Sequence, residues 1–339
     1  MNDYYANESE FAEQSRINYE YYLREKRELK RNANILGFAL VLMYAVTFLV
    51  AGGLFLWMGA TFSRMAIEEN MALLENIASL VAYVLAFAVP CVVAVIMLRI
   101  PRSVAFPMRA PKLDLTVASV FICFGVSIIG RQASELVSLG ISSAFGIVPT
   151  MPDFTPPEGT IPLVLYTVSM TVAAAFLEEL FFRGVVLQSL RRFGDGFAIV
   201  VSSILFAMAH GNLVQGVNVL IVGLVIGFFV LRTGSLWTGI IIHFANNALA
   251  VCMDMAFQAL EQYSRGTELL VAVYFAIHVF GGLLAAAYLM ATYPDIWRLR
   301  PSRSRLMTGE KFRGFFLSAM PIVAVIITII ITSRFFEPA

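Results

Sequence analysis

The chain has 339 residues, of which 59% are hydrophobic and only 14% are charged. A soluble domain carries about 25% charged residues and needs a polar outer layer, so this composition excludes a water-soluble globular protein. The net charge is +1 and no basic region stands apart, which argues against nucleic acid as a partner. We therefore expect an integral membrane protein of all-α class, a polytopic transmembrane helical bundle with about eight or nine spans in the lipid bilayer.

A spanning helix needs about 20 mostly apolar residues, because the hydrocarbon is about 30 Å thick and each residue rises about 1.5 Å. A polar segment rich in Tyr, residues 1–33, precedes the first apolar window and is not a signal peptide, which would start with a short basic stretch and continue as an apolar run. The predicted spans are 32–63, 76–98, 115–130, 159–177, 196–210, 213–231, 233–253, 269–294 and 314–333.

The limits of the third, fifth and sixth predicted spans depend on particular residues. The third window is short, and we expect it to continue through Arg131 and Glu135, which have i,i+4 spacing and could pair. The fifth and sixth form one long uncharged stretch, which the turn signal Gly211-Asn212 divides into a tight hairpin. Within the sixth, Gly223 and Gly227 have the spacing that lets a neighbouring helix approach closely.

The positions of Lys and Arg predict the orientation. With the N-terminus in the cytoplasm, all but four of the 24 basic residues fall on the inner side, whereas the reverse topology places them outside. This pattern predicts a cytoplasmic N-terminus, and we expect the protein to lie in the cell (plasma) membrane.

Ionisable residues are costly inside a bilayer, so the few in this chain are candidates for function. Late in the fourth span stands Glu178-Glu179-Leu-Phe-Phe-Arg183. Glu179 and Arg183 are four residues apart, in the favourable order for an ion pair, whereas Glu178 points about 100° away and has no partner on its own helix. A buried carboxylate without a partner can act as a base. The alternative is a charge cluster at a helix end.

Two further pairs have i,i+4 spacing on later helices: Phe206 with His210 in the fifth span, and His243 with Asn247 in the seventh. Asn246 lies close to the second pair and is a lesser candidate. Each pair alone is more typical of packing or interhelical hydrogen bonding. However, counting along the helices puts Glu178, His210 and His243 about 14–22 Å from the cytoplasmic ends, in one layer of the membrane.

The set EExxxR, FxxxH and HxxxN on successive membrane helices resembles the CPBP family of intramembrane proteases, which includes CAAX prenyl endopeptidases and bacteriocin-processing, Abi-type proteins. The resemblance implies a core of catalytic helices at 159–258, between flanking transmembrane helices at 34–158 and C-terminal ones at 259–339. It also implies peptide-bond hydrolysis in a membrane-associated protein or peptide. The implied catalytic residues are Glu178, Glu179, Arg183, Phe206, His210, His243 and Asn247.

In the implied mechanism, Glu178 and His210 activate a water, and His243 and Asn247 donate to the oxyanion, with no resident cofactor. A zinc ion held by Glu178, His210 and His243 is the alternative, although no HExxH motif is present. Two other functions stay open: a non-proteolytic immunity or scaffold protein of the same fold, and a proton-coupled transporter. No internal repeat favours the transporter.

Overall fold

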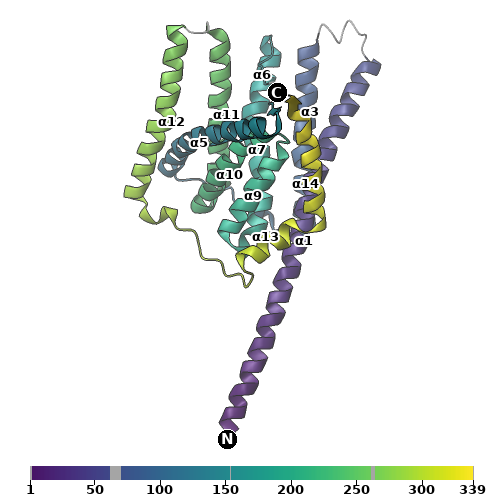
Figure 1. Cartoon of the computed structure of the whole chain (residues 1–339), viewed down its shortest axis with the longest axis vertical. Coiled ribbons are helices and arrows are strands. Elements are labelled where there is room, and N and C mark those ends of the chain that lie inside the picture. Colours follow the sequence, from purple (N-terminus) through teal and green to yellow (C-terminus); the bar gives the residue numbers. More distant parts are fainter. Residues whose placement is uncertain (1, 62–69, 153, 261–263, 339) are drawn as a thin grey trace.

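The computed structural model describes residues 2–61, 70–152, 154–260 and 264–338, and this part of the chain is almost entirely helical (Figure 1). The predicted all-α class is therefore confirmed. The only strands described are short, Ile147–Pro149 (β1) and Phe336–Pro338 (β2), and they pair antiparallel. The α-helices are α1 (Asn2–Thr61), α3 (Met71–Leu98), α4 (Arg102–Ala105), α5 (Leu113–Phe145), α6 (Thr160–Val168), α7 (Ala174–Glu179), α8 (Leu187–Leu190), α9 (Asp195–Ala209), α10 (Leu213–Thr233), α11 (Leu236–Ala259), α12 (Arg265–Thr292), α13 (Thr308–Phe316) and α14 (Ala319–Thr332).

Five short helical segments are wound more tightly or more widely than an α-helix. They are the π-helical segments η1 (Ser169–Ala173) and η2 (Leu180–Val186), and the 3₁₀ segments η3 (Arg191–Phe193), η4 (Pro294–Trp297) and η5 (Ser333–Phe335). Among the described residues, 7 helices are long and apolar enough to span a membrane, or up to 8 if the bent pair α13 and α14 counts as one. The shorter α9 is apolar and has 15 residues. The N- and C-termini lie toward opposite ends of the molecule (Figure 1).

The structure departs from the sequence-based predictions in three places: two concern spans and one concerns an ion pair. The polar segment 1–33 continues without a break into the first span, so that α1 is a single helix of 60 residues that projects beyond the bundle (Figure 1). The last predicted span, 314–333, is divided between α13 and α14, which meet at a bend of 68°. The predicted ion pair of Arg131 with Glu135 is wrong. Among the described residues Arg131 has no ion-pair partner within 4.0 Å, and its guanidinium lies over the ring of Tyr274 instead.

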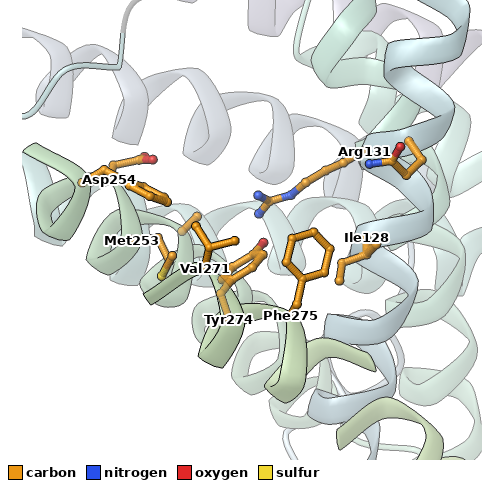
Figure 2. Close-up of a pocket in the computed structure, with 10 residues that line it drawn as sticks. Ile128, Arg131, Met253, Asp254, Val271, Tyr274 and Phe275 are labelled. Carbon is orange, nitrogen blue, oxygen red and sulfur yellow. The ribbon is translucent and has the colours of Figure 1, made fainter. Parts of the chain in front are cut away.

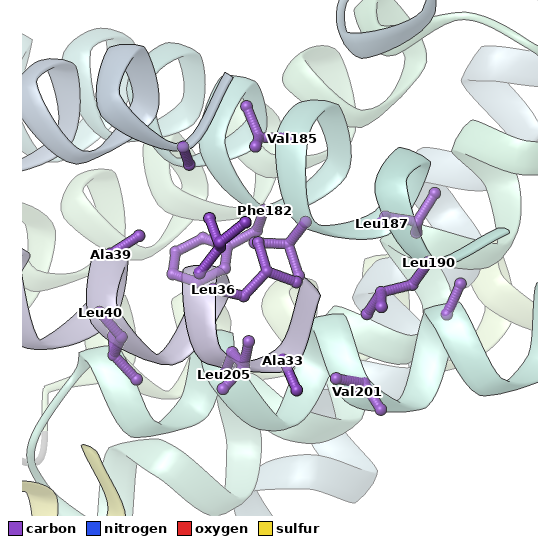
Figure 3. Close-up of a cluster of buried hydrophobic side chains, with 14 of the residues drawn as sticks. Ala33, Leu36, Ala39, Leu40, Phe182, Val185, Leu187, Leu190, Val201 and Leu205 are labelled. Atoms are coloured by element: carbon purple, nitrogen blue, oxygen red, sulfur yellow. The ribbon is translucent and has the colours of Figure 1, made fainter. Parts of the chain in front are cut away.

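The largest apolar core forms where α1 packs against the helix that runs from η2 to α8 and against α9. Figure 3 shows Ala33, Leu36, Ala39 and Leu40 of α1 facing this surface. Their small and branched side chains are buried against residues such as Phe182. The first span therefore helps to hold the central helices in place.

The predicted hairpin between the fifth and sixth spans is confirmed. Gly211 adopts φ +60°, a left-handed conformation that glycine tolerates, and it ends α9. Asn212 caps α10 by accepting a hydrogen bond from the backbone N–H of Gln215 at 3.0 Å. Its Nδ2 donates to the carbonyl oxygen of Thr150 at 2.6 Å, beside β1. The backbone N–H of Thr150 in turn donates to the carbonyl oxygen of Phe335, next to β2.

The predicted close approach at Gly223 and Gly227 is also confirmed. A methyl group added at Gly223 would lie 3.1 Å from Nη2 of Arg183 and 3.2 Å from the Phe206 ring. One added at Gly227 would lie 3.3 Å from Leu187. The absence of side chains on this face of α10 therefore lets the helix pack directly onto the helices that carry the candidate residues.

Candidate active site

Both glutamates lie at the end of α7, a six-residue α-helical segment flanked by the π-helical segments η1 and η2. π-Helical turns are rare and are frequent at functional sites. Both side chains are buried, with Glu178 6% exposed and Glu179 fully enclosed. Two adjacent carboxylates inside an apolar bundle need partners, and the surrounding helices supply them.

Glu179 forms the ion pair that its spacing predicts. Its Oε1 accepts a hydrogen bond from Nη1 of Arg183 at 2.9 Å, and both side chains are fully buried. The other end of the guanidinium donates from Nη2 to the carbonyl oxygen of Gly223 at 3.2 Å. The guanidinium also lies 4.2 Å from the centre of the Phe206 ring. Arg183 therefore ties α7 to α10 and α9 within the membrane.

His243 lies between the two glutamates. Its Nδ1 is 3.0 Å from Oε1 of Glu179, whereas its Nε2 is 3.7 Å from Oε2 of Glu178. A carboxylate only accepts, so Nδ1 carries a hydrogen and donates it to Glu179. The separation of 3.7 Å is too long for a direct hydrogen bond and matches the kind of gap that a polar group or a water bridges.

This close approach depends on a glycine. A methyl group added at Gly239, four residues before His243, would lie 2.8 Å from Oε2 of Glu179 and 2.6 Å from Val230. The bare backbone at Gly239 allows α11 to lie against the helix that carries the glutamates.

Glu178 has a partner that the motifs do not contain. The hydroxyl group of Tyr83, on α3, donates a hydrogen bond to Oε1 of Glu178. The Oε2 atom is buried without a hydrogen-bond partner among the described residues. One oxygen of Glu178 is thus held in place and the other is open toward His243.

The prediction from sequence missed Tyr83, although a signal was present. A tyrosine at the centre of an otherwise apolar span buries a hydroxyl group that requires a partner.

The ring of Phe206 brings the second histidine to the site. It makes edge contacts with the His210 ring, with centres 4.9 Å apart, and with the His243 ring, with centres 5.7 Å apart. Nδ1 of His210 lies 2.9 Å from the carbonyl oxygen of Phe206, which can only accept. Nδ1 therefore donates, and Nε2 of the neutral ring is the free acceptor. His210 and His243 flank one phenyl ring, and His210 makes no direct hydrogen bond to Glu178.

Asn247 lies one turn beyond His243 on α11. Its Nδ2 donates to the carbonyl oxygen of Met170 in η1 at 3.0 Å. A carboxamide nitrogen carries two hydrogens, so one remains for another acceptor. Asn246, the lesser candidate, points away from the site, because its Oδ1 accepts a hydrogen bond from Ser127 of α5 at 3.1 Å.

The donor set for the zinc alternative does not converge. Among the residues that the structure describes, no group of three or more His, Cys, Asp or Glu side chains is arranged to hold a metal ion. The arrangement of Glu178, His210 and His243 therefore does not fit a zinc site as it stands.

Residues 160–249 match the family model described as type II CAAX prenyl endopeptidase, Rce1-like. These residues are therefore similar to that family, in agreement with the resemblance that the motifs carry. All the motif residues lie within this matched segment, which accounts for about a quarter of the chain. No curated protein and no solved structure matches the chain. Tyr83 and the buried residues of α1 that pack against η2 and α9 lie outside the matched segment.

Proposed function

We propose that this integral membrane protein is an intramembrane endopeptidase that hydrolyses a peptide bond in a membrane-associated protein by means of glutamate-activated water. The observation that carries the proposal is the open oxygen of Glu178. It is buried, lacks a hydrogen-bond partner among the described residues, and faces Nε2 of His243 across 3.7 Å. The family of residues 160–249 supports proteolysis as the reaction.

In the first step Glu178 acts as the general base. Tyr83 holds one of its oxygens, so the other is oriented to accept a proton from a water molecule. The free acceptor of His210, Nε2, assists by accepting the second hydrogen bond of that water. The hydroxide attacks the scissile carbonyl, and the proton held by Glu178 then passes to the leaving amine.

In the same step the oxyanion receives hydrogen bonds from His243 and Asn247. His243 gives this hydrogen bond from Nε2 while its Nδ1 donates to Glu179, which requires a hydrogen on each ring nitrogen. The second hydrogen of Asn247 Nδ2 is the other donor. A single donor to an oxyanion contributes about 3–4 kcal/mol to the barrier.

Glu179 and Arg183 have a positioning role in this scheme. Their fully buried ion pair holds His243 through Glu179 and α10 through Gly223. Phe206 separates the two imidazoles and keeps them at fixed angles.

The family model favours a substrate with a lipidated C-terminal CAAX sequence, and a leader or bacteriocin-type peptide is the second candidate. The distribution of basic residues favours an N-terminus in the cytoplasm, and the membrane that we propose for the enzyme is the plasma membrane.

The test is cleavage by the purified full-length chain in proteoliposomes. A prenylated CAAX peptide and a membrane-inserted leader peptide are the two substrates. We expect Glu178→Gln to lower kcat by about 100- to 10,000-fold, the usual contribution of a general base, with normal insertion and thermal stability. Glu135→Gln, outside the site, is the control and should cleave normally. Equal activity of the Glu178 variant and the unchanged protein would refute the proposed base. Cleavage of neither peptide by the unchanged protein would leave the immunity or scaffold role as the better account.

A chelator separates the two proposed mechanisms in the same assay. We expect cleavage to continue after treatment with a strong zinc chelator, because the donors do not converge on a metal site. Loss of activity that added Zn²⁺ restores would contradict the metal-free mechanism.

A further inference from the structure

A second group of ionisable side chains lies inside the bundle, away from the glutamates. A cavity of about 260 Å³ opens between α5, α11 and α12. Its polar lining includes Arg131 of α5, Asp254 of α11 and Tyr274 of α12. Figure 2 shows the guanidinium of Arg131 reaching into the cavity above the Tyr274 ring, with Asp254 facing it from the other side. The rest of the lining is mostly apolar, as in Ile128, Met253 and Phe275.

The polar groups of this cavity lack full partners in the protein. Arg131 and Asp254 form no ion pair within 4.0 Å among the described residues. The centre of the Tyr274 ring lies 5.4 Å from the guanidinium carbon, and the Tyr274 hydroxyl oxygen is buried beside Arg131 without a hydrogen bond of ordinary geometry in the described chain. Buried polar atoms are normally satisfied, so this hydroxyl group points to a ligand.

The Tyr274 side chain is held rigidly in this position. The ring of His278, one turn further along α12, is 1% exposed and lies 3.9 Å from the Tyr274 ring. Nδ1 of His278 in turn lies 2.8 Å from the carbonyl oxygen of Tyr274. A fixed phenol beside a guanidinium is a preorganised pair of hydrogen-bond donors.

Helix lengths place the cavity toward one end of the bundle. Asp254 is about five turns, or 27 Å, from Leu236 at the start of α11, and Tyr274 is the same distance from Thr292 at the end of α12. α11 and α12 run in opposite directions, so these two counts place both side chains toward the same end of the bundle, away from the N-terminus (Figure 1). The hydrocarbon is about 30 Å thick, so the polar groups lie near its outer edge.

We propose that this cavity binds the headgroup of a zwitterionic phospholipid with a primary ammonium group. The phosphate accepts hydrogen bonds from Arg131 and the Tyr274 hydroxyl group, and the ammonium group donates to Asp254. An arginine is well suited to a phosphate because its planar guanidinium donates in a fork. Phosphatidylglycerol would satisfy Arg131 through the same phosphate, but it would offer Asp254 neutral hydroxyl groups in place of a cation. The two opposite charges in one cavity therefore select a ligand that carries both.

The test is native mass spectrometry of the purified full-length chain. The protein is equilibrated with equal amounts of phosphatidylethanolamine and phosphatidylglycerol that have the same acyl chains. We expect the unchanged protein to retain phosphatidylethanolamine in preference, and Arg131→Gln and Asp254→Asn each to reduce its retention about tenfold, the effect of losing about 1.4 kcal/mol. Glu135→Gln is the matched control, since Glu135 lies one turn from Arg131 on α5 outside the cavity lining, and it should retain lipid normally.

Several results would overturn the proposal. Equal retention of both lipids by the unchanged protein would refute the role of Asp254. Unchanged retention in both cavity variants would show that the lipid binds elsewhere. If Arg131→Gln does not fold, Tyr274→Phe provides the test, and normal retention in that variant would also refute the site. If the variants raise KM for a peptide substrate while lipid retention stays the same, the cavity binds the substrate and the lipid assignment is wrong.

Discussion

The hydroxyl group of Tyr83 donates a hydrogen bond to Oε1 of Glu178, although the two residues are 95 positions apart in the chain. This contact joins α3, which lies outside the segment matched by the family model, to the proposed general base. The orientation of the base is therefore set by a flanking span as well as by the core.

We expect Tyr83→Phe to lower kcat by about 10- to 100-fold with little change in KM. The substitution keeps the ring and removes only a hydrogen bond to a carboxylate, which contributes about 1.5–3 kcal/mol. Steady-state kinetics in proteoliposomes measure the effect. Tyr288→Phe is the control, because that hydroxyl group contacts Asp114 rather than the site. A normal kcat in the Tyr83 variant would mean that the contact does not orient the base.

Glu179→Gln should destabilise the protein more than Glu178→Gln does. Removing the charge of Glu179 leaves Arg183 buried without its ion-pair partner, which costs about 3–5 kcal/mol. Glu178 takes no part in that pair. Thermal unfolding of the two variants in detergent compares them directly. Arg24→Gln, which breaks an exposed i,i+4 pair, should change the free energy of unfolding by less than about 1 kcal/mol. Equal stability of both glutamine variants would refute the structural importance of the buried pair.

Gly223→Ala should lower both stability and activity. The added methyl group would lie 3.1–3.2 Å from Arg183, Phe206 and Ser203, and overpacking of this kind costs about 1–3 kcal/mol. Gly140→Ala on α5 is the matched control, because nothing lies within 4 Å of the added methyl group. Alanine favours a helix over glycine, so this control should unfold at the same temperature or higher. If both variants behave alike, α10 does not pack as tightly as the structure describes.

Asn212→Ala should reduce activity through His210, two residues earlier. The substitution removes the cap of α10 and the hydrogen bond to Thr150, with a loss of about 0.5–2 kcal/mol in stability. Ser264→Ala removes an equivalent cap at the start of α12, where the side chain accepts from Thr267, far from the site in the chain. The two variants should lose similar stability, and only Asn212→Ala should lower kcat. An equal kcat in the two would show that the loop does not position His210.

The sequence predicts the helical architecture well because apolar length and basic flanks are local signals. The windows that became α3, α10 and α11, and the turn at Gly211, follow directly from them. The i,i+4 spacing also predicts the ion pair of Glu179 with Arg183.

Contacts between residues that are far apart in the chain cannot be predicted from these local signals. The position of His243 beside both glutamates depends on how closely α11 approaches α7, and Gly239 permits that close approach. Arg131 turns to Tyr274 rather than to Glu135 because α12 packs against α5 at that level. Helix packing determines these contacts, and it depends on residues from several helices at once.

The short pairing of β2 with β1 has a practical consequence for handling the protein. The last described residues, Phe336–Pro338, are hydrogen-bonded to the segment that anchors the loop after α9. An affinity tag or fluorescent fusion added at the C-terminus would place its attachment point beside that loop. The long exposed helix at the start of the chain offers an attachment point remote from it.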